Sequence, residues 1–394
     1  MWKEIAPDMR RQLIIVLGLG LLCGWVMGAQ FYVARLVHQL NGSATVAGML
    51  LVMSLLPVLL VALNGRRIAA RWTLRQQLRM GLLCYAVQMV LLASAPNLAW
   101  LIPAMLLSGF GYAFAFGPLL TSATDAAPKA YYAQAISYIS LSVQLGIGTF
   151  SIIAAIAEPQ FGTRGIFWLP LALALVAMVF CRYLPHAKAL PADAADDAKK
   201  PRHAGSMFEV FILMAILGLT FGLPLQFVPM WLGASRELSF SPGYFLTTTF
   251  FTIMTTRIFF GHWLNGEREQ HVVKTCFTVA AIAIAVLGFA HSPLQFALCA
   301  IPYGAAYSLL YPSCMAYLIK QVDEADRGVR STWVLLAFEI GTRCLPFLFG
   351  IIADHGGFPL TFEILAVLIA AAGVWHVIKR FNLWRPAASV PLAD

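Results

Sequence analysis

Three charged side chains stand inside stretches that are otherwise apolar enough to cross a membrane. Glu339 and Arg343 lie within residues 331–354, four positions apart, so both face the same side of a helix. Arg257 lies eight positions before Asn265, where its own apolar stretch ends. A charged side chain at membrane depth is costly, so such residues mark ligand binding, proton transfer or an ion pair. The sequence therefore predicts a polar site built on these three residues.

The depth of the charges predicts how they divide their work. Glu339 is about 12 Å from the start of its stretch, at about 1.5 Å per residue. Arg257 lies equally deep, so we expect these two residues to form an ion pair that holds structure or a gate. Arg343 is one turn nearer the middle and is the expected substrate contact, with pairing to Glu339 as the alternative. Glu339 is also the proton-coupling candidate, because a buried carboxylate beside an arginine can be tuned to bind or release a proton.

Neutral polar side chains in the same stretches are further candidates for contact with a polar solute. No Asp or Glu occurs between Asp8 and Asp125, so this part of the chain offers only uncharged groups. The three buried charges sum to +1, which suits an anionic or zwitterionic solute better than a bare cation. The substrate-binding candidates are Arg343, Gln30, Tyr32, Tyr112, Gln144, Gln226, Tyr303 and Tyr307.

Some of these candidates have a structural alternative. Gln30 and Gln226 could line a cavity or could hydrogen-bond neighbouring helices. Tyr303 and Tyr307 belong, with Tyr311, to one helical stripe that could be a cavity wall or a packing seam. Two prolines are candidates for a structural or gating role and not for contact with the solute. Pro224 and Pro229 bracket Gln226 and are expected to break their helix near its outer end, as a gate would need.

The amino-acid composition indicates which kind of secondary-structure element carries these residues. The chain is 60% hydrophobic and 11% charged, whereas a soluble domain has about 25% charged residues. It is predicted to be an all-α membrane protein with twelve transmembrane helices. The predicted spans are residues 12–36, 44–64, 76–95, 98–122, 131–157, 165–184, 208–232, 244–264, 272–291, 294–319, 331–354 and 359–381.

Charge sets the predicted orientation. Most of the 27 Lys and Arg residues fall on one side of the membrane when the N-terminus is cytoplasmic. The positive-inside rule then places both termini in the cytoplasm. The net charge of +9 is explained by this topology, so no nucleic-acid partner is expected. The seven cysteines lie in or beside apolar stretches, without metal-ligand spacing, and are interpreted as buried small hydrophobes.

The chain divides into two halves that contain matching sequence motifs. Residues 185–207 are rich in Pro, Ala and mixed charge, and are predicted to form a cytoplasmic linker. It would join an N-terminal six-helix bundle (1–184) to a C-terminal one (208–381), which a cytoplasmic tail follows (382–394). Matched motifs recur at offsets of 201, 196 and 194 residues, namely Asn64 with Asn265, Gln30 with Gln226, and Pro118 with Pro312. Two parallel repeats around a midplane site are typical of transporters.

Over nearly its whole length, the sequence resembles the major facilitator superfamily. Within it, the sequence is similar to bacterial arabinose-efflux/YfcJ-like permeases and opine-metallophore exporters. The resemblance lies in residues 30–48, in Arg257-Ile-Phe-Phe-Gly261-His-Trp-Leu-Asn265, and in residues 303–350. The superfamily's loop motif has an aspartate at the end of the second span, but Asn64 stands here and Asn265 stands at the repeat position. A neutral amide should weaken the cytoplasmic latch that the motif implies.

These observations predict a secondary active transporter whose two pseudo-symmetric bundles rock around a central site. We expect it as a monomer in the cytoplasmic membrane of a bacterium, with a small-molecule substrate and the lipid bilayer as its partners. Export is the expected direction, with exchange for protons as one way to drive it. Uptake of such a solute, or a sensor that binds it without transport, are the alternatives. No nucleophile–base set or metal-ligand spacing occurs, so no enzyme activity, cofactor or metal is expected.

Overall fold

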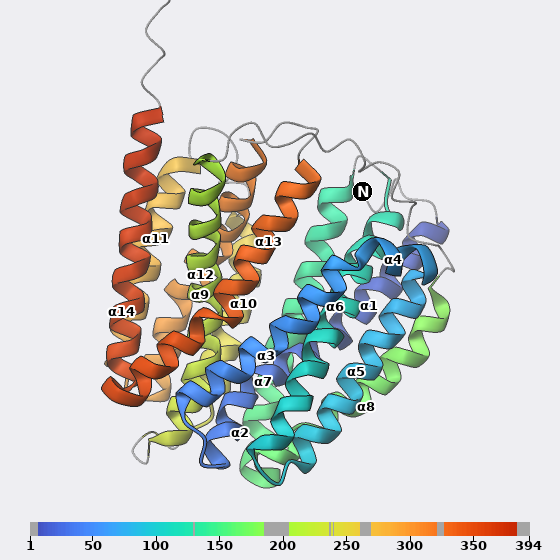
Figure 1. Cartoon of the computed structure of the whole chain (residues 1–394), viewed down its shortest axis with the longest axis horizontal. Coiled ribbons are helices and arrows are strands. Elements are labelled where there is room, and N and C mark those ends of the chain that lie inside the picture. Colours follow the sequence, from blue (N-terminus) through green and yellow to red (C-terminus); the bar gives the residue numbers. More distant parts are fainter. Residues whose placement is uncertain are drawn as a thin grey trace, which may run out of the picture.

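A computed structural model gives the fold of most of the chain (Figure 1). All regular elements in the part that it describes are helices. Asn265, nearly all of the predicted linker and most of the predicted tail lie outside this part, so the predictions made for them stay predictions. The structure describes residues 7–128, 131–184, 205–235, 238, 240–260, 269–320 and 327–383.

Helices α3 and α5 of the N-terminal half begin at side-chain caps. The Ser43 hydroxyl accepts a hydrogen bond from the Val46 amide at the start of α3, and Thr73 and Gln76 form a capping box at the start of α5. Short 3-10 turns interrupt or extend the described part of this half, among them η1 (Gln30–Tyr32), η2 (Leu98–Trp100) and η4 (Cys181–Tyr183). The α-helices are α1 (Pro7–Ala29), α2 (Val33–Gln39), α3 (Ala44–Leu63), α4 (Gly65–Arg71), α5 (Leu74–Ser94), α6 (Leu101–Asp125), α7 (Tyr132–Gly165) and α8 (Trp168–Phe180).

The described helices of the C-terminal half range from 17 residues in α13 to 39 in α14. In this half α13 packs against α9. Helix α10 packs against α12 of the same half and against α7 of the N-terminal half. This arrangement matters for the site, because α10 carries Arg257 and α13 carries Glu339, and these two helices pack on different neighbours. The helices are α9 (Gly205–Ala234), α10 (Gly243–Phe260), α11 (Glu269–Leu287), α12 (Pro293–Lys320), α13 (Arg327–Arg343) and α14 (Leu345–Leu383).

Each of the twelve predicted spans coincides with a helical segment, and this confirms the predicted fold class. Within the described residues, eight segments are long and apolar enough to cross a membrane, and two shorter apolar helices accompany them. One of the eight, Val334–His376, contains two predicted spans. The predicted span 244–264 corresponds to α10, and its last residues lie beyond the described part.

Two glycines turn the chain between consecutive spans. Gly162 has a φ of 70° and Gly357 a φ of 83°, a left-handed backbone region that costs glycine little. They interrupt α7 and α14 at equivalent places, each at a connection between two spans. Their separation, 357 − 162 = 195 positions, falls within the range of offsets between the matched sequence motifs. The backbone therefore supports the predicted repeat.

Two spans are discontinuous close to predicted site residues. Between α1 and α2 the chain forms the 3-10 turn η1, which begins at Gln30. Between α13 and α14 the helix is interrupted at Cys344, directly after Arg343. Discontinuous helices in transporters free backbone groups and aim side chains at a midplane site. Both interruptions therefore lie where a binding site would use them.

The prediction that Pro224 and Pro229 break their helix is wrong, because α9 runs without interruption from Gly205 to Ala234. A proline removes the hydrogen bond to the carbonyl four residues earlier, which for Pro224 is that of Thr220. The Tyr303 hydroxyl on α12 donates to the Thr220 carbonyl at 2.8 Å. A neighbouring helix thus supplies the donor that Pro224 removed.

The two halves make their closest backbone contacts at the end of the bundle that carries Asp354. We call this end the Asp354 end. Figure 1 shows α3 running beside the first part of α14 there. A Cβ atom added at Gly350 would lie 2.5 Å from the Ala44 carbonyl oxygen, so the helices touch through glycine. The Asp354 carboxylate also accepts hydrogen bonds from the Ala44 and Thr45 amides at 2.7 and 2.9 Å, and so caps α3 from the opposite half.

Candidate functional site

Glu339 and Arg343 form an ion pair at the end of α13. Their Oε2 and Nε atoms are 2.7 Å apart, and their side chains are only 13% and 14% exposed. This was the alternative to the predicted pair of Glu339 with Arg257. It arises because residues four apart on a helix meet without any help from tertiary packing.

Both members of this pair also bind the N-terminal half. Arg343 Nη1 donates to the Ser54 hydroxyl on α3 at 2.7 Å. The Tyr112 hydroxyl on α6 donates to Glu339 Oε1 at 2.9 Å. The Arg343 guanidinium also lies over the Tyr112 ring, 4.9 Å from its centroid, in a cation–π contact. We call Ser54, Tyr112, Glu339 and Arg343 the central cluster.

Arg257 lies away from the central cluster. Its Nη1 donates to the Ser140 hydroxyl on α7 at 3.3 Å, and its buried Nε makes no hydrogen bond. The expectation that it pairs with Glu339 is therefore wrong for this structure. Arg257 and Glu339 were predicted at equal depth but do not form a pair, because α10 packs on α12 and α7 whereas α13 packs on α9. Tyr311 of α12 interacts electrostatically with both residues.

The tyrosine stripe of α12 divides into two parts. Tyr303 is 1% exposed and, as described, holds the α9 backbone, so it is a structural residue here. Tyr307 and Tyr311 instead form an aromatic wall with two phenylalanines. The Tyr307 ring stacks on Phe221 at a centroid distance of 4.7 Å, and the Tyr311 ring meets Phe338 edge-on at 5.2 Å. The stripe is thus partly a packing seam and partly a wall near Arg257 and Glu339.

Gln30 bonds neighbouring helices, which was the structural alternative for it. Its amide exchanges two hydrogen bonds with Gln88 of α5, at 2.9 and 2.7 Å, and accepts a third from Ser108 of α6 at 3.2 Å. Tyr32 is fully buried, with its ring edge-on to Phe150 at 5.9 Å. Tyr32 is therefore enclosed in this conformation, whereas Gln30 is half-buried and its contact with a solute stays a prediction.

The remaining predicted residues fall in different places. Gln226 is buried, at 7% exposure, inside α9. Gln144 is partly buried on α7, and its side-chain carbonyl oxygen Oε1 is enclosed without a hydrogen-bond donor. Asn64 ends α3, and its amide donates to the Leu60 carbonyl of the same helix at 2.8 Å. Its gating role stays a prediction, as does that of Asn265.

Sequence reasoning missed two serines and one ion pair. Ser54 and Ser140 are single small polar residues in apolar runs, and only their contacts with arginines distinguish them. Arg35 of α2 and Glu158 of α7 form a second buried ion pair at 2.7 Å. The sequence feature that could have indicated this pair is that Arg35 lies inside a predicted span and Glu158 directly after one.

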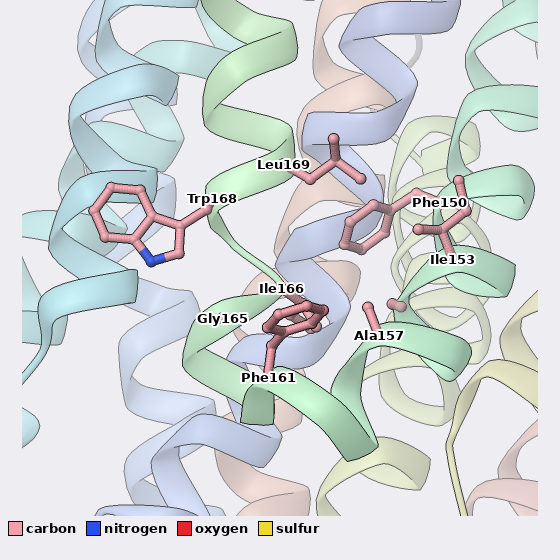
Figure 2. A pocket seen from close by; sticks show the side chains of 9 residues that line it. Phe150, Ile153, Ala157, Phe161, Gly165, Ile166, Trp168 and Leu169 are labelled. Atoms are coloured by element: carbon pink, nitrogen blue, oxygen red, sulfur yellow. The ribbon is translucent and has the colours of Figure 1, made fainter.

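An apolar pocket of about 680 Å³ lies between α7 and α8, away from the central cluster (Figure 2). Phe150, Phe161 and Leu169 are among the side chains that line it. No charged residue contributes to its wall, so it offers nothing to orient a polar solute. Among the described residues no three His, Cys, Asp or Glu side chains gather as a metal site would need.

A transporter family model matches most of the chain, and individual relatives match a little over half of it. The family model described as the Major Facilitator Superfamily matches residues 13–268 and 247–391. The uncharacterized MFS-type transporter YhhS of Escherichia coli K12 is 22% identical over 224 residues, 56% of this chain and 53% of that protein. YhhS of the strain CFT073 is 22% identical over 237 residues, 59% of this chain and 55% of that protein. The chain thus spans about half the length of these curated relatives.

Solved structures show the same fold. The nucleoside transporter NupG superposes with a TM-score of 0.73 at 14% identity, and the match covers 94% of this chain and 99% of that one. A POT family transporter in complex with a thioalcohol-conjugated peptide superposes with a TM-score of 0.76 at 13% identity, and this match covers 95% and 97% of the two chains. At such identities the likeness shows the fold alone.

Proposed function

Because the chain belongs to the Major Facilitator Superfamily, we propose that it is a secondary active transporter that exports a small anionic or zwitterionic metabolite. In this proposal its two halves rock around the central cluster in the cytoplasmic membrane of a bacterium. Both termini lie in the cytoplasm, so the Asp354 end faces outward. Export as the direction rests on the resemblance of residues 257–265 and 303–350 to efflux-type permeases.

The central cluster is the observation that carries this proposal. Its ion pair belongs to the C-terminal half, and its two other members, Ser54 and Tyr112, belong to the N-terminal half. Movement of one half against the other must break these contacts. A solute that offers an anionic group to Arg343 could replace them, because charge-assisted hydrogen bonds are the stronger ones. Binding and movement are then coupled at one place.

Glu339 gives the proposed exchange its proton site. As a carboxylate it accepts from both Arg343 and Tyr112. A proton on this group would remove the charge that holds Arg343, and would free the guanidinium for the solute. Proton binding and solute binding at Glu339 and Arg343 would therefore be linked, as exchange requires.

Replacement of Glu339 by glutamine tests this proposal. Glu339→Gln should abolish solute movement driven by a pH gradient in liposomes, but leave counterflow exchange measurable, because only the proton step is lost. Asp8→Asn is the matched control, since Asp8 is exposed in the first turn of α1. Normal pH-driven accumulation by the Glu339 variant would contradict the role of Glu339.

The same liposomes separate the proposed function from its alternatives. A transporter moves solute across the bilayer, whereas a sensor binds solute without flux under any gradient. Inside-out and right-side-out vesicles distinguish export from uptake, because a proton-driven exporter accumulates solute only in the inside-out preparation. Accumulation confined to right-side-out vesicles would instead establish uptake.

A further inference from the structure

Arg257 is an incompletely satisfied cation between the two halves. Its Nε is buried without a hydrogen bond, and Nη1 makes a single long bond to Ser140. No carboxylate of the described residues lies within ion-pair distance of it. A neutral hydroxyl compensates poorly for a buried charge, and an uncompensated charge in a membrane protein is costly. An anion from outside the chain would remove this cost.

Gln144 adds an unsatisfied acceptor on the same helical face. It is one turn from Ser140 on α7, about 6 Å along the axis at 1.5 Å per residue. One turn further along this face, a Cβ added at Gly148 would lie 3.1 Å from the Phe251 ring of α10. Gln144 therefore stands between two contacts with α10, the helix of Arg257. Its Oε1 is enclosed and accepts no hydrogen bond.

The aromatic wall borders these groups. Tyr307 and Tyr311 lie on α12, which packs on α10, the helix of Arg257. Next to Tyr307, the Ser308 hydroxyl donates to the Ile253 carbonyl of α10 at 2.8 Å, one turn from Arg257, and both tyrosines interact electrostatically with Arg257. Phe221 and Phe338 extend the wall through ring contacts with the two tyrosines. This surface suits a planar apolar group, which could stack on it at the offset distances that aromatic rings prefer.

We infer that Arg257, Ser140 and Gln144 form an anion subsite for a monocarboxylate that carries an O–H or N–H donor on the neighbouring carbon and a planar apolar group beyond it. The carboxylate accepts from Arg257 Nε, the neighbouring donor bonds Gln144 Oε1, and the planar group packs on the tyrosine wall. This inference rests on the proposed transport function and names its substrate class. The central cluster neutralises its own charges, so the subsite needs one negative charge only.

Mandelate and three close analogues test each part of the inference. Mandelate has a carboxylate, a neighbouring hydroxyl and a phenyl ring; mandelamide lacks the charge, phenylacetate the hydroxyl, and lactate the ring. Isothermal titration of the full chain in nanodiscs should show that mandelate binds most tightly and mandelamide most weakly. Equal binding of mandelate and mandelamide, or no binding of any of the four, would overturn the inferred class.

Two substitutions locate the binding. Arg257→Gln should weaken mandelate binding about 10- to 100-fold, as the loss of a hydrogen bond to a charged group does. Gln144→Leu should weaken mandelate about 5-fold but leave phenylacetate unchanged, since phenylacetate has no hydroxyl to lose. This second variant keeps the test decisive if Arg257→Gln does not fold. The exposed Arg164 gives a matched control, and Arg164→Gln should bind mandelate normally.

Flux measurements keep this inference separate from the proposed function. If mandelate binds through Arg257 but neither it nor any other tested solute crosses a liposome membrane, the subsite stands and the transport proposal fails. If the chain moves other solutes while Arg257→Gln and Gln144→Leu bind mandelate as the wild type does, the subsite is wrong and transport stands.

Discussion

At the scale of single residues, the two buried arginines have different surroundings. Arg343 has a carboxylate, a hydroxyl and an aromatic face as partners, whereas Arg257 has one hydroxyl at 3.3 Å. The sequence predicted Arg257 and Glu339 at equal depth and Arg343 one turn nearer the middle, but depth is only one coordinate. Which arginine meets Glu339 also depends on how α10 is rotated and on what lies between the helices. Neither can be derived from hydropathy.

This difference predicts which arginine stabilises the fold. Arg343→Ala strands Glu339 as a buried, unpaired carboxylate, and breaking a buried pair in this way costs about 3–5 kcal/mol. Arg343→Ala should therefore lower the melting temperature of the purified protein, and Arg343→Ala with Glu339→Ala should recover part of the loss. Arg257→Ala strands no carboxylate and should cost less. A larger loss from Arg257→Ala than from Arg343→Ala would contradict this assignment.

At the scale of elements, the spans were predictable and their interruptions were not. Long apolar runs between polar segments suffice to place twelve helices, because backbone groups in a bilayer must bond within the helix. By the same reasoning the two prolines of α9 predict a break in the helix, because each removes a backbone hydrogen bond. α9 nevertheless continues, and at Pro224 the unpaired Thr220 carbonyl accepts instead from Tyr303, on a helix distant in sequence. Such tertiary compensation leaves no local sequence pattern.

The compensation predicts a coupled effect of two substitutions. Tyr303→Phe removes the donor to Thr220 and should destabilise the protein by about 1 kcal/mol, or more if the carbonyl stays buried and unpaired. Pro224→Ala restores an N–H that can reach the same carbonyl. In that background Tyr303→Phe should cost clearly less, as a thermal-unfolding double-mutant cycle would show. Equal cost in both backgrounds would mean that Tyr303 acts in another way.

At the scale of the whole molecule, the halves meet through helix pairs that glycine brings close at the Asp354 end. Gly350 of α14 lies against Ala44 and Thr45 of α3, and Gly243 of α10 lies against Ala155 and Ser151 of α7. Asp354 adds a charge-assisted cap on α3 across the same interface. Sequence repeats predicted two halves, but not which end would be closed, because alternating access allows either.

A side chain at Gly350 should open this end. Its Cβ would lie 2.5 Å from a backbone oxygen, which cannot rotate away as a side chain would, so α3 and α14 must separate. A cysteine placed by Thr45→Cys should then react several-fold faster with a membrane-impermeant maleimide in Gly350→Leu. Gly18→Leu is the control, since nothing lies within 4 Å of a Cβ there. Unchanged labelling would show that the contact does not hold the end closed.

The bond between Tyr303 and the Thr220 carbonyl also constrains how this chain can evolve. A lineage that keeps proline at position 224 gains from any hydroxyl donor at position 303, whereas a lineage that has lost the proline is free to place phenylalanine or leucine there. The two positions should therefore change together among homologues, although they belong to different helices. In an alignment, this pair should covary more strongly than Pro229 does with any position on α12.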